Sequence, residues 1–227
     1  MLAIADGHGG DKTSSYVAGQ LLKGLFETMM GTGTKNYDEA LRLTFQYLND
    51  STLELSRKTL AHYESGTTLS LAYIPDGDDN LHIGIIGDSP VILAKLDGTF
   101  HISPDHNARS NELERNAAEQ RGGVFQDGYL YSRSRGGKGL QMTRDIGCHF
   151  MGDVLQRHPD IYELGIHHGE VLILGSDGLL DPAHSGGDEE VRRLVRLVLD
   201  GAEAQDLVND ALNRETGDNV SAIVCRP

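Results

Sequence analysis

The most constraining feature of this chain is a run of four β-rich segments, joined only by short turns, in its first half. The segments cover residues 67–74, 81–86, 91–96 and 99–102. Parallel neighbours need a crossover of a dozen or more residues, which these turns cannot supply. The Asp97-Gly98 dipeptide is also typical of a two-residue hairpin. The sequence therefore predicts an antiparallel meander of four strands.

Helical periodicity flanks this region on both sides. Apolar residues recur at intervals of three and four over residues 13–30 and about 38–62, which predicts two long amphipathic helices covering a sheet face. Three more helices are expected at 109–121, 188–199 and 203–214, and three short strands at 2–5, 170–174 and 220–225. The glycine- and arginine-rich stretch 126–140 is expected to be a loop. At 227 residues, the chain is long enough for one α+β domain over residues 1–227.

Charge and cysteine content exclude several classes of protein. With 20 Lys and Arg against 34 Asp and Glu, the net charge of −14 repels phosphate backbones and argues against a nucleic-acid partner. No apolar stretch approaches the roughly 18 residues of a membrane helix, so no membrane partner is expected. Two cysteines, Cys148 and Cys225, cannot form a disulfide framework and favour an intracellular, cytoplasmic protein. The sequence carries no signal for an oligomeric state.

Aspartates recur where predicted apolar strands meet loops. Asp6 and Asp88 follow such strands directly, Asp177 follows another, and Asp218 precedes the last one. An isolated Asp-Gly is usually a turn, but converging carboxylates would repel one another unless a cation lay between them. Oxygen ligands favour Mg²⁺ or Mn²⁺, with Ca²⁺ as an alternative. Zinc is disfavoured because the histidines are scattered and Cys148 has no partner at ligand spacing.

Six short motifs in a fixed order give the chain a family resemblance. They are Asp6-Gly7-His8-Gly9-Gly10, Ser65-Gly66-Thr67-Thr68, Gly87-Asp88-Ser89, Met142-Thr143-Arg144, Ser176-Asp177-Gly178-Leu179-Leu180-Asp181 and Gly217-Asp218-Asn219-Val220-Ser221. This series resembles the metal-dependent serine/threonine protein phosphatases of type 2C, over nearly the whole chain. The resemblance implies a four-layer αββα sandwich, in which helices flank two antiparallel sheets and a binuclear Mn²⁺ or Mg²⁺ centre lies at one edge.

The resemblance also implies ligands for these ions. Asp6 matches the carboxylate that bridges the two metals, and the carbonyl of Gly7 matches a ligand of the second metal. Asp177 and Asp218 match ligands of the first metal. The reaction implied is hydrolysis of phosphoserine or phosphothreonine on a phosphoprotein substrate, with a metal-bridging hydroxide as nucleophile.

Further roles follow for three more residues. Asp88 and Asp181 match the pair linked to a third, weaker metal site in some members, although an aspartate that caps a turn or helix fits both positions equally well. His8 matches the histidine proposed as general acid for the leaving alkoxide. The alternative for His8 is a histidine hydrogen-bonded within the same turn. Cys148 is expected to be a small packing residue.

The chain also departs from the family pattern. Its first strand lacks the usual upstream segment, which holds a phosphate-binding arginine and a Glu-Asp pair, so we expect a form truncated at its N-terminus relative to the family. Pro90 stands where the family often has arginine, and Cys148 stands at the last position of a Thr/Ser-Arg-x-x-Gly-Asp element. These departures motivate two alternatives: a pseudophosphatase that binds or regulates without turnover, and a hydrolase of small phosphate esters. Arg144 is expected to pair with an acidic neighbour, and the nine histidines other than His8 to lie on the surface or in turns.

Overall fold

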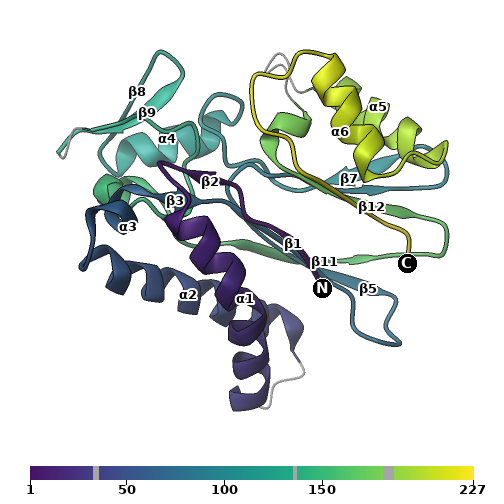
Figure 1. Cartoon of the computed structure of the whole chain (residues 1–227), viewed down its shortest axis with the longest axis horizontal. Helices are drawn as coiled ribbons and strands as arrows, with labels where there is room; N and C mark the ends of the chain where they lie inside the picture. Colours follow the sequence, from purple (N-terminus) through teal and green to yellow (C-terminus); the bar gives the residue numbers. More distant parts are fainter. Residues whose placement is uncertain (33–35, 135–136, 181–186) are drawn as a thin grey trace.

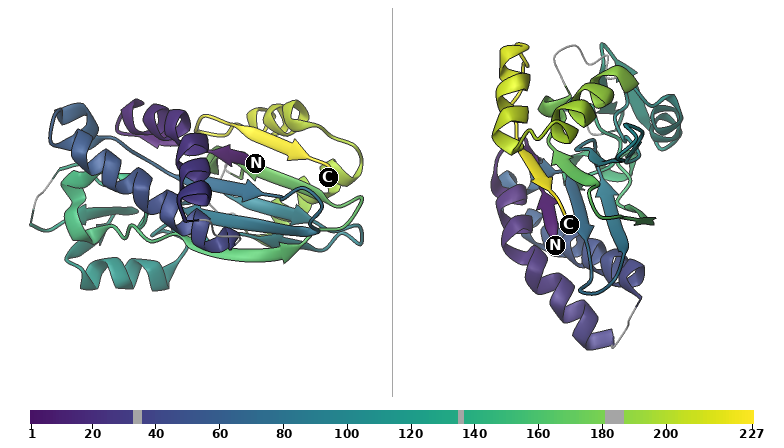
Figure 2. Two further views of the ribbon diagram at one scale, coloured as in Figure 1. Left: turned by 90° about the horizontal axis from the view of Figure 1, so that it is seen from below. Right: turned by 90° about the vertical axis from the view of Figure 1, so that its right-hand side faces the viewer.

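The computed structural model describes residues 1–32, 36–134, 137–180 and 187–227 as two antiparallel sheets packed face to face between two pairs of helices. Figure 1 shows the helix pairs on opposite sides of the sheets. The predicted four-layer αββα sandwich is therefore confirmed. The N- and C-terminal ends of the chain lie near each other in all three views (Figures 1 and 2). No helix in the described ranges is both long and apolar enough to cross a bilayer.

The first sheet is covered by the N-terminal helices α1 (Lys12–Thr32) and α2 (Tyr37–Ser56). Its strands, in spatial order, are β1 (Leu2–Ile4), β4 (Leu69–Tyr73), β5 (Asn80–Ile86) and β11 (Asp160–Gly165). Val17 and Phe45 of the helices pack with Leu71 of the sheet in one buried cluster. Successive side chains of a strand point to opposite faces of its sheet. The odd-numbered residues of β5 therefore face the second sheet and not the helices.

The second sheet is covered by α5 (Asp188–Leu199) and α6 (Ala204–Asn213). Its strands, in spatial order, are β13 (Ala222–Cys225), β12 (Val171–Gly175), β6 (Val91–Ala94) and β7 (Phe100–Ile102). Val191, Leu194 and Leu207 turn inward from the helices onto this sheet. Between the two sheets lies a separate apolar layer that includes Ile83 and Leu172.

The predicted four-stranded meander is wrong, because its strands are divided between the two sheets. Strands β4 and β5 pair in the first sheet, whereas β6 and β7 pair in the second. The chain crosses between sheets at residues 87–90. Gly87 has φ of +100°, and a Cβ there would lie 2.6 Å from the Cγ2 of Thr68. Pro90 stands just before β6, where its carbonyl accepts a hydrogen bond from the Gly175 amide at 3.0 Å.

Two other elements differ from the sequence prediction. The helix expected over 38–62 ends at Ser56, and a short helix, α3 (Leu60–Glu64), begins after Thr59. Thr59 has extended backbone and its side chain accepts a hydrogen bond from the His62 amide, which starts a new helix instead of continuing the old one. Strand β11 was not predicted.

The expected loop at 126–140 contains a β-hairpin instead. Strands β8 (Gly123–Gln126) and β9 (Tyr129–Ser132) flank Asp127-Gly128, and both turn residues have positive φ. This turn is the two-residue connection that favours hairpins, and its Asp-Gly signal is present in the sequence. The hairpin packs beside α4 (Glu112–Gln120), the shortened form of the helix predicted at 109–121.

Candidate metal centre

Asp6 stands just beyond β1, and the Thr67-Thr68 pair fixes its backbone. Its amide donates to the Thr68 hydroxyl at 3.1 Å. Its carbonyl accepts from the Thr68 amide and the Thr67 hydroxyl, both at 2.9 Å. Gly7 follows, and its backbone pairs with Thr67 in a small sheet separate from the two main ones. Three hydrogen bonds therefore hold the backbone of Asp6 where the first sheet ends.

Asp88 lies at the corner where the chain crosses between sheets. The hydroxyls of Thr68 and Ser89 are 2.7 Å apart, which ties this corner to the segment that holds Asp6. The Asn107 side-chain amide donates to the Asp88 carboxylate at 2.8 Å. Two motifs that are distant in the sequence thus share one hydrogen-bonded unit.

Asp177 and Asp218 are held together at the end of the second sheet. The Ser176 hydroxyl donates to the carbonyl of Asn219 at 3.1 Å and accepts from the Ser221 amide at 3.0 Å. Gly178 permits this approach, since a Cβ there would lie 2.4 Å from the Asn219 carbonyl oxygen. The segments that carry Asp177 and Asp218 are therefore in direct backbone contact.

The four aspartates lie close enough to perturb one another. Burial, followed by the charge of Asp218, raises the pKa of Asp6 above its usual value. Burial raises the pKa of Asp177 to about 8, with the charges of Asp88, Asp6 and Asp218 adding to the shift. Burial and the charge of Asp105 raise the pKa of Asp88 to about 6.

The donor type of this cluster suits a hard divalent cation. Burial and neighbouring carboxylates are the main causes of the raised pKa values, and no lysine or arginine in the described part of the chain offsets them. All four side chains offer oxygen ligands, the donor type that Mg²⁺ and Mn²⁺ prefer. Asp181, the remaining predicted ligand, lies outside the described residues.

A cleft of about 320 Å³ opens beside the cluster. Asp88 and Asp177 line it, together with Asp105, Asn107 and Arg109. The sequence prediction missed the last three, which lie in a short connection after β7 with no motif to mark them. Among the described residues of this lining, Arg109 is the cationic one.

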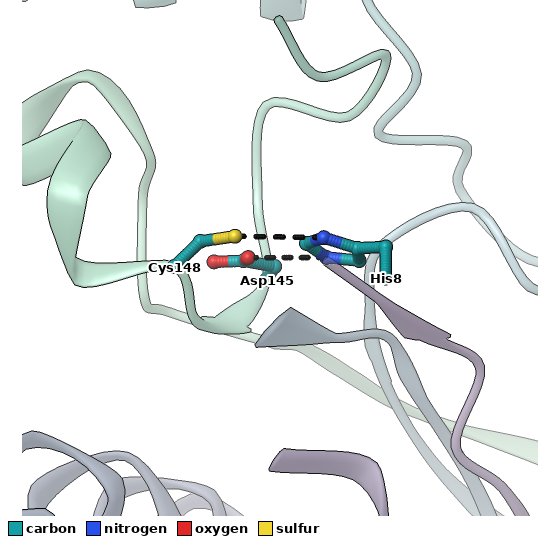
Figure 3. A group of neighbouring side chains, drawn as sticks. All are labelled: His8, Asp145 and Cys148. Atoms are coloured by element: carbon teal, nitrogen blue, oxygen red, sulfur yellow. Dashed lines mark hydrogen bonds and ion pairs between the residues drawn. The ribbon is translucent and has the colours of Figure 1, made fainter. Parts of the chain in front are cut away.

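His8 is positioned by three short strands that run beside the main sheets. Strand β2 (Gly7–His8) pairs with β3 (Gly66–Thr67), which pairs with β10 (Ile146–Gly147). This pairing brings His8 against Asp145 and Cys148, which flank β10; both face the imidazole ring (Figure 3). His8 Nε2 lies 3.3 Å from Asp145 Oδ2, and its Nδ1 lies 3.4 Å from Cys148 Sγ. Burial lowers the pKa of His8 to about 4, so the ring is neutral at neutral pH.

An ion-pair network connects to the backbone beside Asp88. Arg144 contacts both carboxylate oxygens of Glu114 and donates to Asp160 at 3.1 Å, so the prediction of an acidic partner is confirmed. His106 Nε2 lies 3.0 Å from the same aspartate, and its Nδ1 accepts from the Gly87 amide at 3.1 Å. The prediction that the other histidines lie on the surface or in turns is wrong for His82, which is buried in β5 and faces a carboxylate. His106 lies in a connection between elements, but it is buried there and also faces a carboxylate.

Comparison with known proteins defines the class of this chain. Residues 1–220 match the family model described as Protein phosphatase 2C. The Arabidopsis thaliana protein named "Probable protein phosphatase 2C 76" is 29% identical over the whole chain, which covers 51% of that protein. "Probable protein phosphatase 2C 9" of the same plant is 30% identical, and the chain covers 76% of it. The chain therefore belongs to the protein phosphatase 2C family.

Solved structures show the same fold. A C. elegans sex determining protein superposes over 98% of this chain and 55% of its own, with a TM-score of 0.79 and 22% identity. The serine-threonine phosphatase 2C of Toxoplasma gondii superposes over 98% of this chain and 83% of its own, with a TM-score of 0.75 and 17% identity. The chain spans about half the length of some curated relatives, at 51% and 44% of two of them.

Proposed function

We propose that this chain hydrolyses phosphoserine and phosphothreonine on proteins with the help of Mn²⁺ or Mg²⁺. The observation that carries this proposal is the convergence of Asp6, Asp88, Asp177 and Asp218 at one edge of the sandwich, where burial and neighbouring carboxylates raise the pKa values of Asp6, Asp88 and Asp177. Clustered carboxylates without a compensating cation destabilise a fold. Such a cluster is better explained by bound cations than by structural need. Membership of the protein phosphatase 2C family supports the same conclusion.

Two ions would be held by Asp6, the Gly7 carbonyl, Asp177 and Asp218. Asp88 and Asp181 would serve a third ion. When bound, these ions supply a water activated at neutral pH and positive charge for the transferring phosphoryl group. The chain itself holds the carboxylates in place through the Thr67-Thr68 and Ser176 hydrogen bonds described above.

The cleft beside the cluster suits a phosphorylated peptide. Arg109 carries a guanidinium, the group that matches phosphate geometry, and the rest of the described lining combines acidic and polar residues with apolar ones. We assign Arg109 to substrate binding.

Two further expectations stay predictions. The acidic net charge predicts that the chain has no nucleic-acid partner. The low cysteine content predicts an intracellular, cytoplasmic location.

We propose that His8 donates a proton to the leaving oxygen, which requires its ring, neutral at neutral pH in this structure, to take up a proton first. Both of its ring nitrogens contact buried protein groups, so the role requires one of these contacts to be exchanged for the substrate. A His8→Gln variant should then lose more activity on a phosphoserine peptide, whose leaving group needs a proton, than on p-nitrophenyl phosphate. Equal losses on both substrates would remove His8 from this step.

The central test is metal-dependent turnover of a phosphoserine peptide by the purified chain. Activity should require Mn²⁺ or Mg²⁺ and disappear in EDTA. Asp177→Asn should lower kcat by more than roughly 100-fold, since even outer-shell partners of a metal contribute about 10–100-fold. The matched control is Asp97→Asn, which should retain activity. Asp97 lies in an exposed turn after β6, at the end of that strand opposite to Asp88.

Two outcomes would contradict the proposal. Turnover by Asp177→Asn at the rate of Asp97→Asn would remove Asp177 from the centre. A folded wild-type chain without metal-dependent turnover of any phosphoester would favour the binding or regulatory module, and activity on small esters alone would favour the small-ester hydrolase.

A further inference from the structure

His8, Asp145 and Cys148 form a compact group of metal-ligating atoms separate from the aspartate cluster. One ligand atom from each of the three lies within 4.8 Å of the other two, the one such trio among the described residues. Asp145 and Cys148 are fully buried, and His8 is largely so. The group combines nitrogen, oxygen and sulfur donors, whereas the aspartate cluster offers oxygen alone.

Two atoms of this trio are left without hydrogen-bond partners. His8 Nε2 and Asp145 Oδ2 are both buried and face each other at 3.3 Å, yet neither makes a hydrogen bond to any described residue. The other oxygen of Asp145 is held by the guanidinium of Arg157. Arg157 therefore fixes the carboxylate, while Oδ2 has a charge contact with His8 Nε2 at 3.3 Å and no hydrogen bond. A buried carboxylate oxygen without a hydrogen bond is costly, and a cation is one way to satisfy it.

The space between the ligands is kept open by a glycine. A Cβ built on Gly66 would lie 2.4 Å from Asp145 Oδ2 and 2.8 Å from His8 Nε2. Any side chain at this position would therefore occupy the gap between the two atoms. Gly66 belongs to β3, the strand that joins β2 to β10 and so assembles the trio.

Two contacts within the trio have the length of a ligand–ligand edge in a tetrahedral site. Zinc bonds of about 2.0–2.3 Å at tetrahedral angles place neighbouring ligand atoms roughly 3.3–3.6 Å apart. The observed separations are 3.3 Å between Nε2 and Oδ2 and 3.4 Å between Nδ1 and Sγ. Because an ion can use one ring nitrogen only, its binding requires a small shift of the imidazole toward either Asp145 or Cys148. The sulfur donor selects against Mg²⁺ and Ca²⁺.

We propose that His8, Asp145 and Cys148 bind a single thiophilic divalent cation of the Zn²⁺ class, with water in the fourth position. Burial raises the pKa of the Cys148 thiol to about 12, so the sulfur is protonated without an ion. Binding therefore releases the thiol proton to solvent as the sulfur–metal bond forms. If the proposed function also holds, an ion at this site ties up His8 and inhibits turnover.

The test is titration of the full chain with Co²⁺, monitored by absorption spectroscopy. A cobalt ion bound by Cys148 gives a thiolate-to-metal charge-transfer band in the near ultraviolet, which carboxylate ligands do not give. In the wild type, the band should reach its maximum when one cobalt ion per chain is bound at this site. It should disappear when added Zn²⁺ displaces the cobalt. It should be lost in Cys148→Ser and retained in Cys225→Ser, the matched control at the only other cysteine.

The wild-type spectrum keeps the proposal falsifiable even if Cys148→Ser does not fold. A wild type without the band overturns the site, and so does a band that is lost in Cys225→Ser but kept in Cys148→Ser. Because this readout does not depend on turnover, it is independent of the test in the preceding section. Asp177→Asn should lose phosphatase activity but keep the cobalt–thiolate band.

Discussion

At the scale of single residues, the ion pairs behind the site are as important as the carboxylates in it. Arg144 bridges Glu114 and Asp160 with its side chain only 13% exposed. Asp160 in turn contacts His106, whose ring accepts a hydrogen bond from the amide of Gly87, the residue before Asp88. One buried guanidinium therefore supports the corner that carries a proposed metal ligand.

Replacing Arg144 should destabilise the fold strongly. We expect Arg144→Ala to lower the free energy of unfolding by about 3 kcal/mol, because it leaves Glu114 buried without its partner. Urea unfolding would measure the change. Arg192→Ala, which breaks an exposed pair with Asp188, is the control and should cost no more than about 1 kcal/mol. Equal effects in the two variants would show that the Arg144 network contributes little.

At the scale of elements, a glycine lets helix α2 lie directly on the first sheet. A Cβ on Gly84 of β5 would lie 2.7 Å from the Cε2 of Phe45, a fully buried residue of α2. The close approach explains why β5 carries no side chain at this point. It also brings the helix onto the strand that leads to Asp88.

Gly84→Ala should therefore force helix and sheet apart. Overpacking of this kind costs about 1–3 kcal/mol, and thermal unfolding should show a lowered Tm. Gly165→Ala, at the end of neighbouring β11, has nothing within 4 Å of the added methyl and provides the control. A Tm for Gly84→Ala as high as that of Gly165→Ala would contradict the direct packing.

At the scale of the whole molecule, the aspartate cluster makes stability depend on pH and on metal. The folded-state pKa values of Asp88 and Asp177, about 6 and about 8, lie above the ordinary value of 3.8. A carboxyl whose folded pKa is raised stabilises the fold below its unfolded pKa. That contribution is lost as pH rises through the folded value. Metal-free protein should therefore lose this stability between about pH 4 and pH 8.

Thermal unfolding in EDTA would measure this dependence. The wild type should lose stability relative to Asp177→Asn as the pH is raised from 5 to 8, since the variant lacks the most strongly shifted carboxyl. Mn²⁺ should raise the wild-type Tm more at pH 8 than at pH 5, because binding requires ionised ligands. Parallel pH profiles for the two proteins would show that Asp177 is not perturbed.

Local patterns in the sequence determined much of this protein. Periodicity located α1, α5 and α6 closely, because an amphipathic helix depends on residues three and four apart. The motifs that carry Asp6, Asp88, Asp177 and Asp218 identified the family, and the comparisons confirmed it. The sequence also contains the Asp127-Gly128 signal of a hairpin, but the glycines and arginines that follow it favoured the prediction of a loop.

Tertiary structure alone decided which strands share a sheet and which side chains meet. A short turn is compatible with either a hairpin or a crossing between sheets, so residues 87–90 could not reveal that β6 leaves its neighbour β5. The ligands His8 and Cys148 lie 140 residues apart, and only the pairing of β2, β3 and β10 brings them into contact. Sequence spacing argued against zinc for this reason, since spacing records neighbours along the chain whereas a metal ion requires neighbours in space.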